Sequence, residues 1–340
     1  TSFVIAITLR RRSSISFQDD PPSSRRPTPS GSEVIEQAFI RQGIDAIAAK
    51  IMLASISDST LKQYSHTYKL WYKYCTENKV SLYGASVSEV IQFLRQLYLN
   101  GNQLYGTFNS HRSALSLILH QDLSNNPLLK RFLKGIARKR PQTPRYNYTW
   151  DPGVVLRYLE GVEGSSSLKL LSRKAVTLLA LVTGGRLQTI SLIRLSNIVS
   201  SAEQIQIYIT DRIKTTFASK TQPCLHIPFF PGNKSICPAS TLLNYIDATE
   251  GLRQNEDYLF LTYAGKHRRA TKETISRWVR CTLKEAGVDT SLFKPHSTRH
   301  SASSAAKRAG VSIEEICRTA GWSEGTATFA RFYDRPLQDT

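Results

Sequence analysis

The second half of the sequence carries arginine and histidine side chains whose types could bind and activate a phosphate ester. Arg186 follows Gly184–Gly185 at the end of a hydrophobic segment, where glycines let a backbone and a guanidinium approach a ligand closely. The segment KPHSTRHS then supplies His296, Arg299 and His300. A guanidinium stays protonated and donates from a planar fork, so two arginines could hold the charge that develops on a phosphate under attack. A histidine beside them could act as a general base or as a third phosphate ligand.

Two aromatic residues near the C-terminus could complete such a site. Trp322 has one indole N–H, which could donate to a phosphate oxygen. Tyr333 carries a phenol, which is a poor nucleophile until a cationic pocket or a base helps to ionise it. Taken singly, each of these residues is more typical of core packing.

Metal chemistry is disfavoured by the same sequence. His296 and His300 have the i, i+4 spacing of a zinc metallopeptidase helix, but Ser297 stands where that motif needs a glutamate. The five cysteines form no CxxC pair, which argues against a cysteine zinc site and against a disulfide framework. We therefore expect no metal, no other cofactor and a reducing compartment.

The order of these residues resembles the catalytic domain of the tyrosine recombinases, the phage integrase family. The motifs that carry the resemblance are TGGR at Arg186, a lysine in a predicted β-hairpin, HSTRH, AGW and a tyrosine about ten residues later. The resemblance covers roughly residues 150–335. The GW pair and the KTT-containing hairpin look most like recombinases of eukaryotic mobile elements, of the DIRS retrotransposon type.

The resemblance implies a role for each residue. Tyr333 would be the nucleophile, Arg186 and Arg299 would clamp the phosphate, and His296 and Trp322 would assist them. In this family a hairpin lysine gives a proton to the leaving 5′-oxygen. Lys214, in DRIKTTF, is favoured for that role over Lys220, and His300 is a further candidate with an uncertain role.

Two positions depart from the family pattern. An acidic residue is common three positions after the first arginine, and here that position is Thr189. The spacing of eleven residues between Trp322 and Tyr333 is slightly longer than the usual nine. These departures leave open which contacts support Arg186 and what path the chain takes to Tyr333.

The elements around these residues predict a mostly α-helical catalytic domain over residues 150–340 with one small antiparallel β-sheet. Helical patterns cover residues 152–160, 167–183, 238–250, 271–286, 297–308 and 312–319. The segments QIQIYIT and PCLHIPFF alternate apolar and polar residues, as paired strands do, and a turn-like segment over 211–221 joins them. This arrangement resembles the tyrosine recombinase catalytic fold.

The preceding residues predict a second, all-helical domain. Residues 33–140 contain four or five helical patterns, one of them over about 107–120, and look like the family's core-binding, SAM-like domain. In one of them Leu61, Tyr64, Tyr68, Trp71 and Cys75 share a face, which predicts a core stripe more than a base-stacking platform. Residues 1–32 are rich in arginine, serine and proline and are expected to form a flexible basic arm. Residues 141–149 are the expected linker, so the two domains would form a clamp around DNA.

A run of basic residues precedes and enters this linker, with no acidic residue between Asp122 and Asp151. Such a one-sided run fits a strap along DNA phosphates better than an ordinary solvated face. The expected DNA-binding residues are Lys130, Arg131, Lys134, Arg138, Lys139, Arg140 and Arg145.

Charge supports a polyanionic partner for the whole chain. Its 45 lysines and arginines exceed its 26 acidic residues, which gives a net charge of +19. The sequence shows neither a transmembrane run, nor a basic amphipathic helix for a membrane surface, nor a secretory signal. We expect duplex DNA as the partner and a nuclear location in a eukaryote, or otherwise a cytoplasmic or nucleoid one.

The resemblance implies a site-specific DNA recombinase or integrase that works through a 3′-phosphotyrosyl intermediate, as a homotetramer on DNA. Three alternatives stay open. The first is a type IB topoisomerase-like enzyme, which nicks and reseals a single duplex. The second is a domesticated DNA-binding protein with an idle active site. The third is an unrelated helical interaction protein with a basic surface, which would bind DNA weakly and without a covalent bond.

Overall fold

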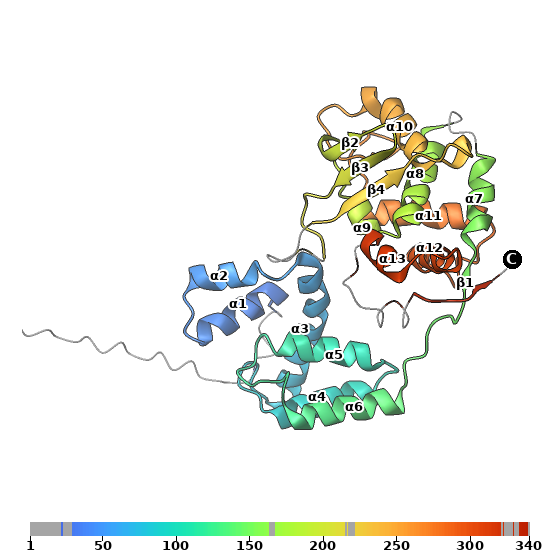
Figure 1. Cartoon of the computed structure of the whole chain (residues 1–340). Helices are drawn as coiled ribbons and strands as arrows, with labels where there is room; N and C mark the ends of the chain where they lie inside the picture. The colour runs from blue at the N-terminus through green and yellow to red at the C-terminus, as the bar shows by residue number, and fades with distance from the viewer. Residues whose placement is uncertain are drawn as a thin grey trace, which may run out of the picture. The chain divides into compact units, whose positions relative to one another are not determined.

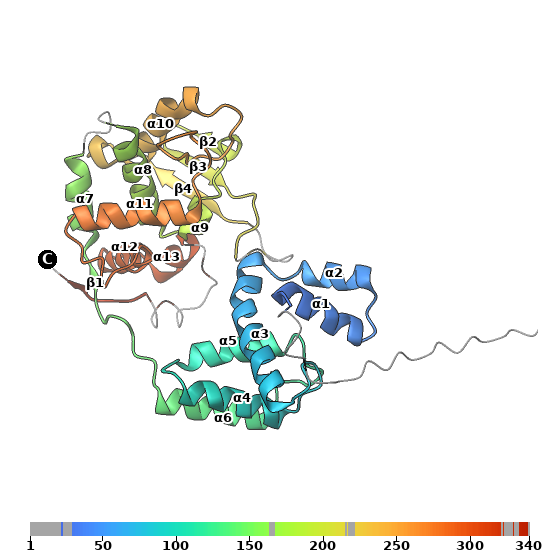
Figure 2. The same cartoon turned by 180° about the vertical axis from the view of Figure 1, so that it is seen from behind.

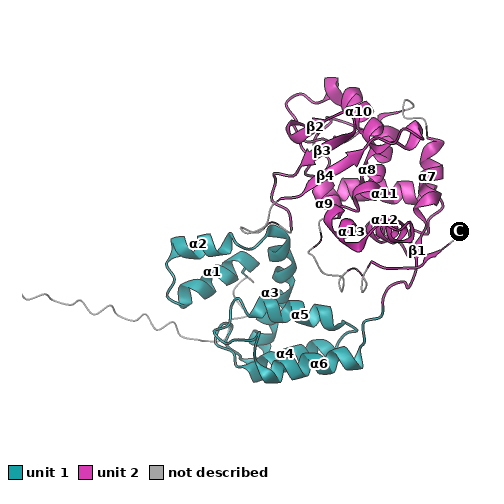
Figure 3. Cartoon of the chain, in the orientation of Figure 1, with its two compact units in different colours: residues 1–143 teal, residues 144–340 magenta. Residues whose placement is uncertain are grey.

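The computed structural model describes residues 29–162, 167–214, 222–320 and 333–338, together with Pro22, Thr216, Trp322 and Phe329. The chain divides into two compact units, unit 1 (residues 1–143) and unit 2 (residues 144–340), which Figure 3 distinguishes by colour. Most of the expected basic arm, residues 1–32, lies outside the described residues, and so does Lys220.

Unit 1 is built from helices, blue to green in Figure 1. The described residues of this unit hold six helices, more than the four or five predicted, because the chain breaks into separate short helices between residues 31 and 53. They are α1 (Gly31–Arg41), α2 (Ala46–Leu53), α3 (Asp58–Asn78), α4 (Val87–Leu99), α5 (Tyr105–Leu115) and α6 (Pro127–Lys139). Side-chain caps fix several of their starts. Ser30 and Ser86 form capping boxes with Glu33 and Glu89, which satisfies backbone N–H groups that α1 and α4 would otherwise leave unpaired.

The aromatic face of α3 lies in the core of unit 1. Tyr68, Trp71 and Cys75 are buried, and the Trp71 ring stacks on Tyr74 with 5.5 Å between centroids. The edge of Phe93, from α4, meets Trp71 at 5.1 Å. The prediction that this stripe belongs to the core is therefore confirmed.

Helix α8 (Leu168–Thr183) forms the centre of unit 2. Every residue from Leu171 to Ala180 is buried. Helices α10 (Pro238–Thr249) and α11 (Lys272–Glu285) pack against it, as both views show (Figures 1 and 2). The buried cation of Arg173 pairs with Glu285 at 2.7 Å, so burial does not leave this charge uncompensated.

The remaining helices of unit 2 are short. They are α7 (Pro152–Glu160), α9 (Leu187–Ile190), α12 (Ser297–Arg308) and α13 (Ile313–Thr319). Three 3₁₀ turns accompany them, η1 (Leu195–Asn197), η2 (Lys234–Ile236) and η3 (Glu250–Leu252). None of the helices in the described parts of the chain is long and apolar enough to cross a membrane.

A three-stranded antiparallel sheet of order β2-β3-β4 follows α9 along the chain. Its strands are β2 (Ile198–Ser200), β3 (Gln204–Tyr208) and β4 (Cys224–Pro228). Ile205 lies opposite Ile227, and Ile207 lies opposite Leu225; all four are buried. The predicted small antiparallel sheet in a mostly helical chain is thus confirmed. The short strand β2 was not predicted, because three residues carry no readable alternation.

A second sheet joins the two ends of unit 2. Strand β1 (Thr149–Trp150) pairs in parallel with β5 (Leu337–Gln338), and the Thr149 N–H donates to the Pro336 carbonyl at 2.9 Å. The expected linker also contacts this unit, since the ring of Tyr146 lies 5.0 Å from that of Phe293. The chain on the C-terminal side of Tyr333 is thereby tied to the start of unit 2.

Candidate active site

The break between α8 and α9 places Arg186. Gly184 ends α8 in the left-handed region (φ 53°), a conformation that glycine adopts without strain. The N–H of Gly185 donates to the Thr183 side chain at 3.0 Å, which turns the chain away from the helix axis. Arg186 then stands at the N-cap of α9 and is half-buried. Thr189, where the family pattern has an acid, is buried in the same short helix.

The first turn of α12 places three of the predicted residues. His296 is its N-cap, and Arg299 and His300 follow inside the helix. The buried indole of Trp150 donates to the Ser297 hydroxyl at 2.9 Å and so anchors this turn to β1. Arg299 is 1% exposed, whereas His296 is exposed at the surface of the unit.

Tyr333 lies against this turn. Its ring is stacked on Trp322 at 3.9 Å between centroids, with 25° between the planes, and lies 4.9 Å from the ring of His300. The guanidinium carbon of Arg299 is 5.0 Å from the centroid of Trp322 and 5.6 Å from that of Tyr333. The structure therefore brings together four residues that the sequence separates by up to 34 positions.

The backbone around Tyr333 is held by α12. The Ser304 hydroxyl donates to the Tyr333 carbonyl at 2.7 Å and accepts from the Arg335 N–H at 3.1 Å. Lys307, one turn further along, forms an ion pair with Asp334. These contacts fix the chain at the tyrosine to the same helix that carries Arg299.

Several buried N–H donors in this cluster make no hydrogen bond within the part of the chain that the structure describes. All three guanidinium nitrogens of Arg299 and the indole nitrogen of Trp322 are buried without a hydrogen-bond acceptor among the described residues. Burial lowers the pKa of Arg299, whereas the charge of the Tyr333 phenol and the closeness of its oxygen to the guanidinium raise it. That oxygen does not meet the geometry of a hydrogen bond, so the three nitrogens stay without a partner in the described chain. Buried donors normally have partners, so these hydrogens are available to an anion that enters the site.

His296 reports which cations lie near it. The pKa of His296 is lowered to about 4. The largest cause is the loss of water around the ring, which protein atoms surround although part of the side chain is exposed, and the charges of four cations add to it. Those cations are, in order of effect, Arg299, Arg186, Lys272 and Lys214. Imidazole in this place is therefore neutral at physiological pH and can accept a proton or a hydrogen bond.

The same cations assemble the predicted constellation. Arg186, Lys214, His296 and Arg299 gather in one region, with Trp322 and Tyr333 beside Arg299. Lys214 is exposed and stands at a turn, so its ammonium can reach outward. Lys220, the rival candidate, lies outside the described residues.

Lys272 is a cation of this region that sequence reasoning missed. It is the first residue of α11, after the N-cap Thr271, and its charge lowers the pKa of His296. A lysine at the start of a helix is unremarkable in a sequence and opposes the helix dipole slightly. Its relevance comes from the packing of α11 near α9, which the sequence pattern does not reveal.

The predicted DNA-binding run lies mostly on α6 of unit 1. Leu129, Leu133 and Ile136 bury one face of the helix. The cations Lys130, Arg131, Lys134, Arg138 and Lys139 are all exposed, as is Arg145 in unit 2. Arg140 differs from the others because its guanidinium donates to the carbonyls of Tyr98 and Gln103, at 2.7 and 3.2 Å. Its charge is thus engaged within unit 1.

Metal ligands do not gather in the described parts of the chain. No cluster of three or more His, Cys, Asp or Glu side chains that could hold a metal ion occurs there. The residues around Arg299 offer the chemistry of cations, an imidazole, an indole donor and a phenol.

A model of the phage integrase family matches residues 158–338, which is more than half of the chain. No curated protein matches the chain. Nothing in the matches bears on the narrower resemblance to DIRS-type recombinases, which stays a prediction.

Three solved structures share the fold. XerH site-specific recombinase, bound to a palindromic difH substrate in a post-cleavage complex, matches with a TM-score of 0.59 and 13% identity, over 91% of this chain and 95% of that one. The Tn1549 transposon integrase in complex with transposon right end DNA matches with a TM-score of 0.58 and 12% identity, over 92% and 96%. A lambda integrase tetramer bound to a Holliday junction matches with a TM-score of 0.52 and 16% identity, over 91% and 78%. At these identities the likeness shows the fold alone.

Proposed function

Because the chain belongs to the phage integrase family, we propose that it cuts and rejoins duplex DNA through a transient covalent bond between a 3′-phosphate and Tyr333. The observation that carries this proposal is the contact of Tyr333 with Arg299, a buried cation whose donors have no acceptor among the described residues. A scissile phosphate would supply those acceptors and would stand next to the phenol.

The cleavage step exchanges one phosphate ester for another. The Tyr333 phenol oxygen attacks phosphorus in line, the bond from phosphorus to the 5′-oxygen breaks, and a 3′-phosphotyrosyl ester forms. Arg186, Arg299 and the Trp322 indole donate to the non-bridging oxygens, where charge accumulates in the transition state. The ester retains the bond energy, so the released 5′-hydroxyl can reverse the step without a nucleotide cofactor.

Two proton transfers accompany this exchange. Burial of the His296 ring and then the surrounding cations lower its pKa to about 4, so the imidazole is neutral and has a free position to accept the phenolic proton, directly or through water. The Lys214 ammonium donates a proton to the departing 5′-oxygen, which would otherwise leave as an unstable alkoxide. The proton balance of the step is then closed within the protein.

Duplex binding follows from charge more than from shape. The exposed cations of α6 can neutralise phosphates without reading bases, which predicts affinity that falls steeply with salt. Two of the fold neighbours are a recombinase caught after cleavage and an integrase tetramer on a Holliday junction. By analogy this protein works as a homotetramer on DNA, where strand exchange needs four subunits.

The experiment that tests the proposal uses a nicked suicide duplex, from which the short fragment that carries the new 5′-hydroxyl diffuses away and leaves the adduct trapped. We expect a protein–DNA adduct that protease removes and that Tyr333→Phe abolishes. Tyr208→Phe, on the exposed face of β3, is the matched control and should form the adduct normally. An adduct that persists in Tyr333→Phe contradicts the nucleophile assignment. Plasmid relaxation without strand exchange would instead assign the type IB topoisomerase-like activity.

A further inference from the structure

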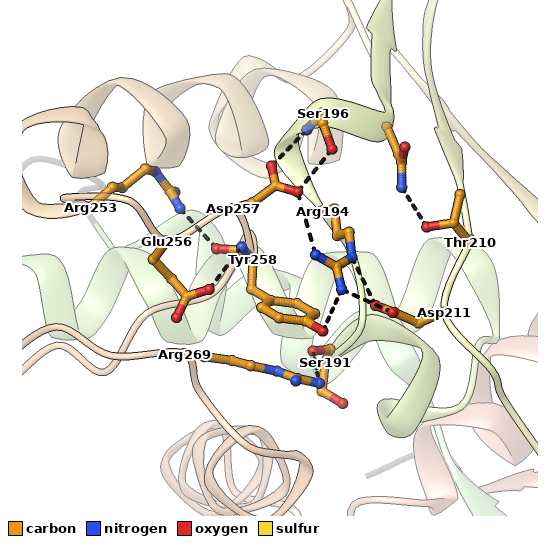
Figure 4. Close-up of polar contacts among 11 residues, drawn as sticks. Ser191, Arg194, Ser196, Thr210, Asp211, Arg253, Glu256, Asp257, Tyr258 and Arg269 are labelled. Atoms are coloured by element: carbon orange, nitrogen blue, oxygen red, sulfur yellow. Dashed lines mark hydrogen bonds and ion pairs between the residues drawn. The ribbon is translucent and has the colours of Figure 1, made fainter.

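The turn that carries Lys214 is anchored three residues earlier by an ion pair. The Arg194 guanidinium donates from Nε and from one terminal nitrogen to the two carboxylate oxygens of Asp211, each at 3.0 Å. This bidentate arrangement fixes both distance and orientation. Arg194 precedes β2, and Asp211 follows β3, so the pair closes the base of the β2-β3 hairpin (Figure 4).

The Arg194–Asp211 pair is itself held rigidly. The Arg194 terminal nitrogen also donates to the Tyr258 hydroxyl at 2.7 Å. The Tyr258 ring lies between two guanidinium groups, 4.3 Å from that of Arg194 and 3.5 Å from that of Arg269 (Figure 4). Asp257 adds a longer ion pair of 3.7 Å to Arg194 and accepts from both Ser196 donors.

The pair connects the segments that carry Arg186 and Lys214. Arg194 lies eight residues after Arg186, and Asp211 lies three residues before Lys214. Ile213, directly before Lys214, is buried and lines a small cavity of about 20 Å³ together with Arg186. The turn is completed by the Ile213 N–H, which donates to the Thr216 hydroxyl at 2.9 Å.

The far side of the turn is tied to the same aspartate. The Gln222 side chain donates to the Asp211 carbonyl at 3.1 Å and accepts from the Thr216 hydroxyl at 3.1 Å. Asp211 therefore meets Arg194 through its side chain and Gln222 through its backbone. Lys214 itself is exposed, so its position depends on the contacts of Asp211 with Arg194 and Gln222.

We propose that the Arg194–Asp211 pair positions the Lys214 ammonium within reach of the phosphate that Arg186 binds. The proposal rests on the proposed function, because it assumes that Lys214 protonates the leaving oxygen. Arg194 and Asp211 touch neither substrate nor reacting atoms in this account, and they act through Lys214. A proton donor works only within hydrogen-bond reach of its acceptor. Breaking the Arg194–Asp211 pair should therefore slow the proton transfer from Lys214 to the leaving oxygen.

The leaving group decides whether that transfer matters. An alkoxide is a strong base and needs the proton, whereas a thiolate, with a pKa of about 8.5, leaves without one. A duplex with sulfur in place of the bridging 5′-oxygen at the cleaved bond therefore bypasses the general acid. It still requires Tyr333, Arg186 and Arg299.

The experiment measures the cleavage rate of the full chain on the oxygen and the sulfur duplex. With Lys214→Ala we expect a loss of about 100-fold on oxygen and recovery to near the wild-type rate on sulfur. With Arg194→Gln and Asp211→Asn we expect a loss of about 10-fold on oxygen, again with recovery on sulfur. The double variant Arg194→Gln/Lys214→Ala should be no slower on oxygen than Lys214→Ala alone, because both changes remove the same transfer.

The control separates positioning from a general loss of structure. Arg173→Ala breaks a comparable ion pair elsewhere in unit 2, to Glu285, and should affect both duplexes alike. If Arg194→Gln is equally slow on oxygen and sulfur, or equally fast as wild type on both, the positioning role is wrong. If instead Lys214→Ala gains nothing from sulfur, the proton-donor role of Lys214 in the proposed function is wrong and the positioning role falls with it.

Discussion

The buried guanidinium of Arg299 should destabilise the DNA-free protein, because its donors gain partners only when a phosphate is bound. Burying an unpaired polar group costs about 1–3 kcal/mol, and replacing even a paired buried charge and its partner by packed apolar residues often gains about 1–4 kcal/mol. Contact of the cation with the rings of Trp322 and Tyr333 offsets about 1 kcal/mol of this. Arg299→Met should therefore stabilise the DNA-free protein by about 2 kcal/mol.

That gain is measurable by calorimetry of the full chain. For a unit of the size of unit 2, about 2 kcal/mol corresponds to a rise of about 4–8 °C in the Tm of its transition. The same substitution should lower the cleavage rate by at least about 100-fold, since it removes a donor to the transition state. We therefore expect Arg299→Met to unfold at a higher temperature than the wild type and to cleave DNA more slowly.

The matched control is the buried arginine Arg253, whose two terminal nitrogens have partners. It donates to the carbonyls of Tyr258 and Leu259, each at 2.9 Å, and to the Thr249 hydroxyl. Arg253→Met should lower the Tm because it leaves those acceptors unpaired. A fall in Tm for Arg299→Met as large as that for Arg253→Met would show that the Arg299 guanidinium is already satisfied in the free protein, and would refute the reasoning.

Three further predictions concern single side chains. Lys272→Ala removes a cation near His296, so the pKa of His296 should rise from about 4 and the acid limb of the cleavage rate should move to higher pH. His111 is buried and has its pKa lowered to about 4, so unit 1 should lose up to about 3 kcal/mol as pH falls from 6.5 to 4, which hydrogen exchange in α3 and α5 measures. Trp322→Phe should keep the stacking on Tyr333 but lose the N–H donor, and so should slow cleavage without lowering the Tm.

Each of these predictions has a control and a contrary result. Lys284→Ala, in the last turn of α11, should leave the titration of His296 unchanged. His111→Gln should make the stability of unit 1 less dependent on pH, since the unfolded state no longer binds the extra proton over that window. Normal cleavage by Trp322→Phe would show that stacking on Tyr333, and not donation, is what the indole supplies.

Periodicity predicted the helical parts of the fold well. The six helices predicted for the catalytic unit begin and end within two residues of their predicted ranges, because their apolar positions recur every three or four residues and polar caps mark most of their starts. The four-residue helix α9 was not predicted, because one turn is too short to show that recurrence. The helix expected over 107–120 is wrong at its end, since α5 stops at Leu115. Consecutive i to i−3 turns follow it, with the N–H groups of Leu117 and Ile118 bonded to Ala114 and Leu115.

Long-range relations were beyond the sequence. Strands β1 and β5 have two residues each and lie nearly 190 positions apart, so neither alternation nor local pairing could predict them. The Arg194–Asp211 pair joins two residue types that are common in loops. Nothing in their spacing distinguishes them from exposed charges that make no ion pair. The order of motifs predicted Arg186, His296 and Arg299 as site residues, and their role stays a prediction; the nearness of Lys272 to them follows only from the packing of α11.

The identity of the residue that becomes attached to DNA tests the central claim most directly. The trapped adduct is digested with nuclease and trypsin, and the modified peptide is sequenced by mass spectrometry. We predict a nucleotide 3′-phosphate on Tyr333, in the tryptic peptide that begins at Phe332. A nucleotide attached to any other residue, or complete strand cleavage with no covalent adduct, would contradict the account.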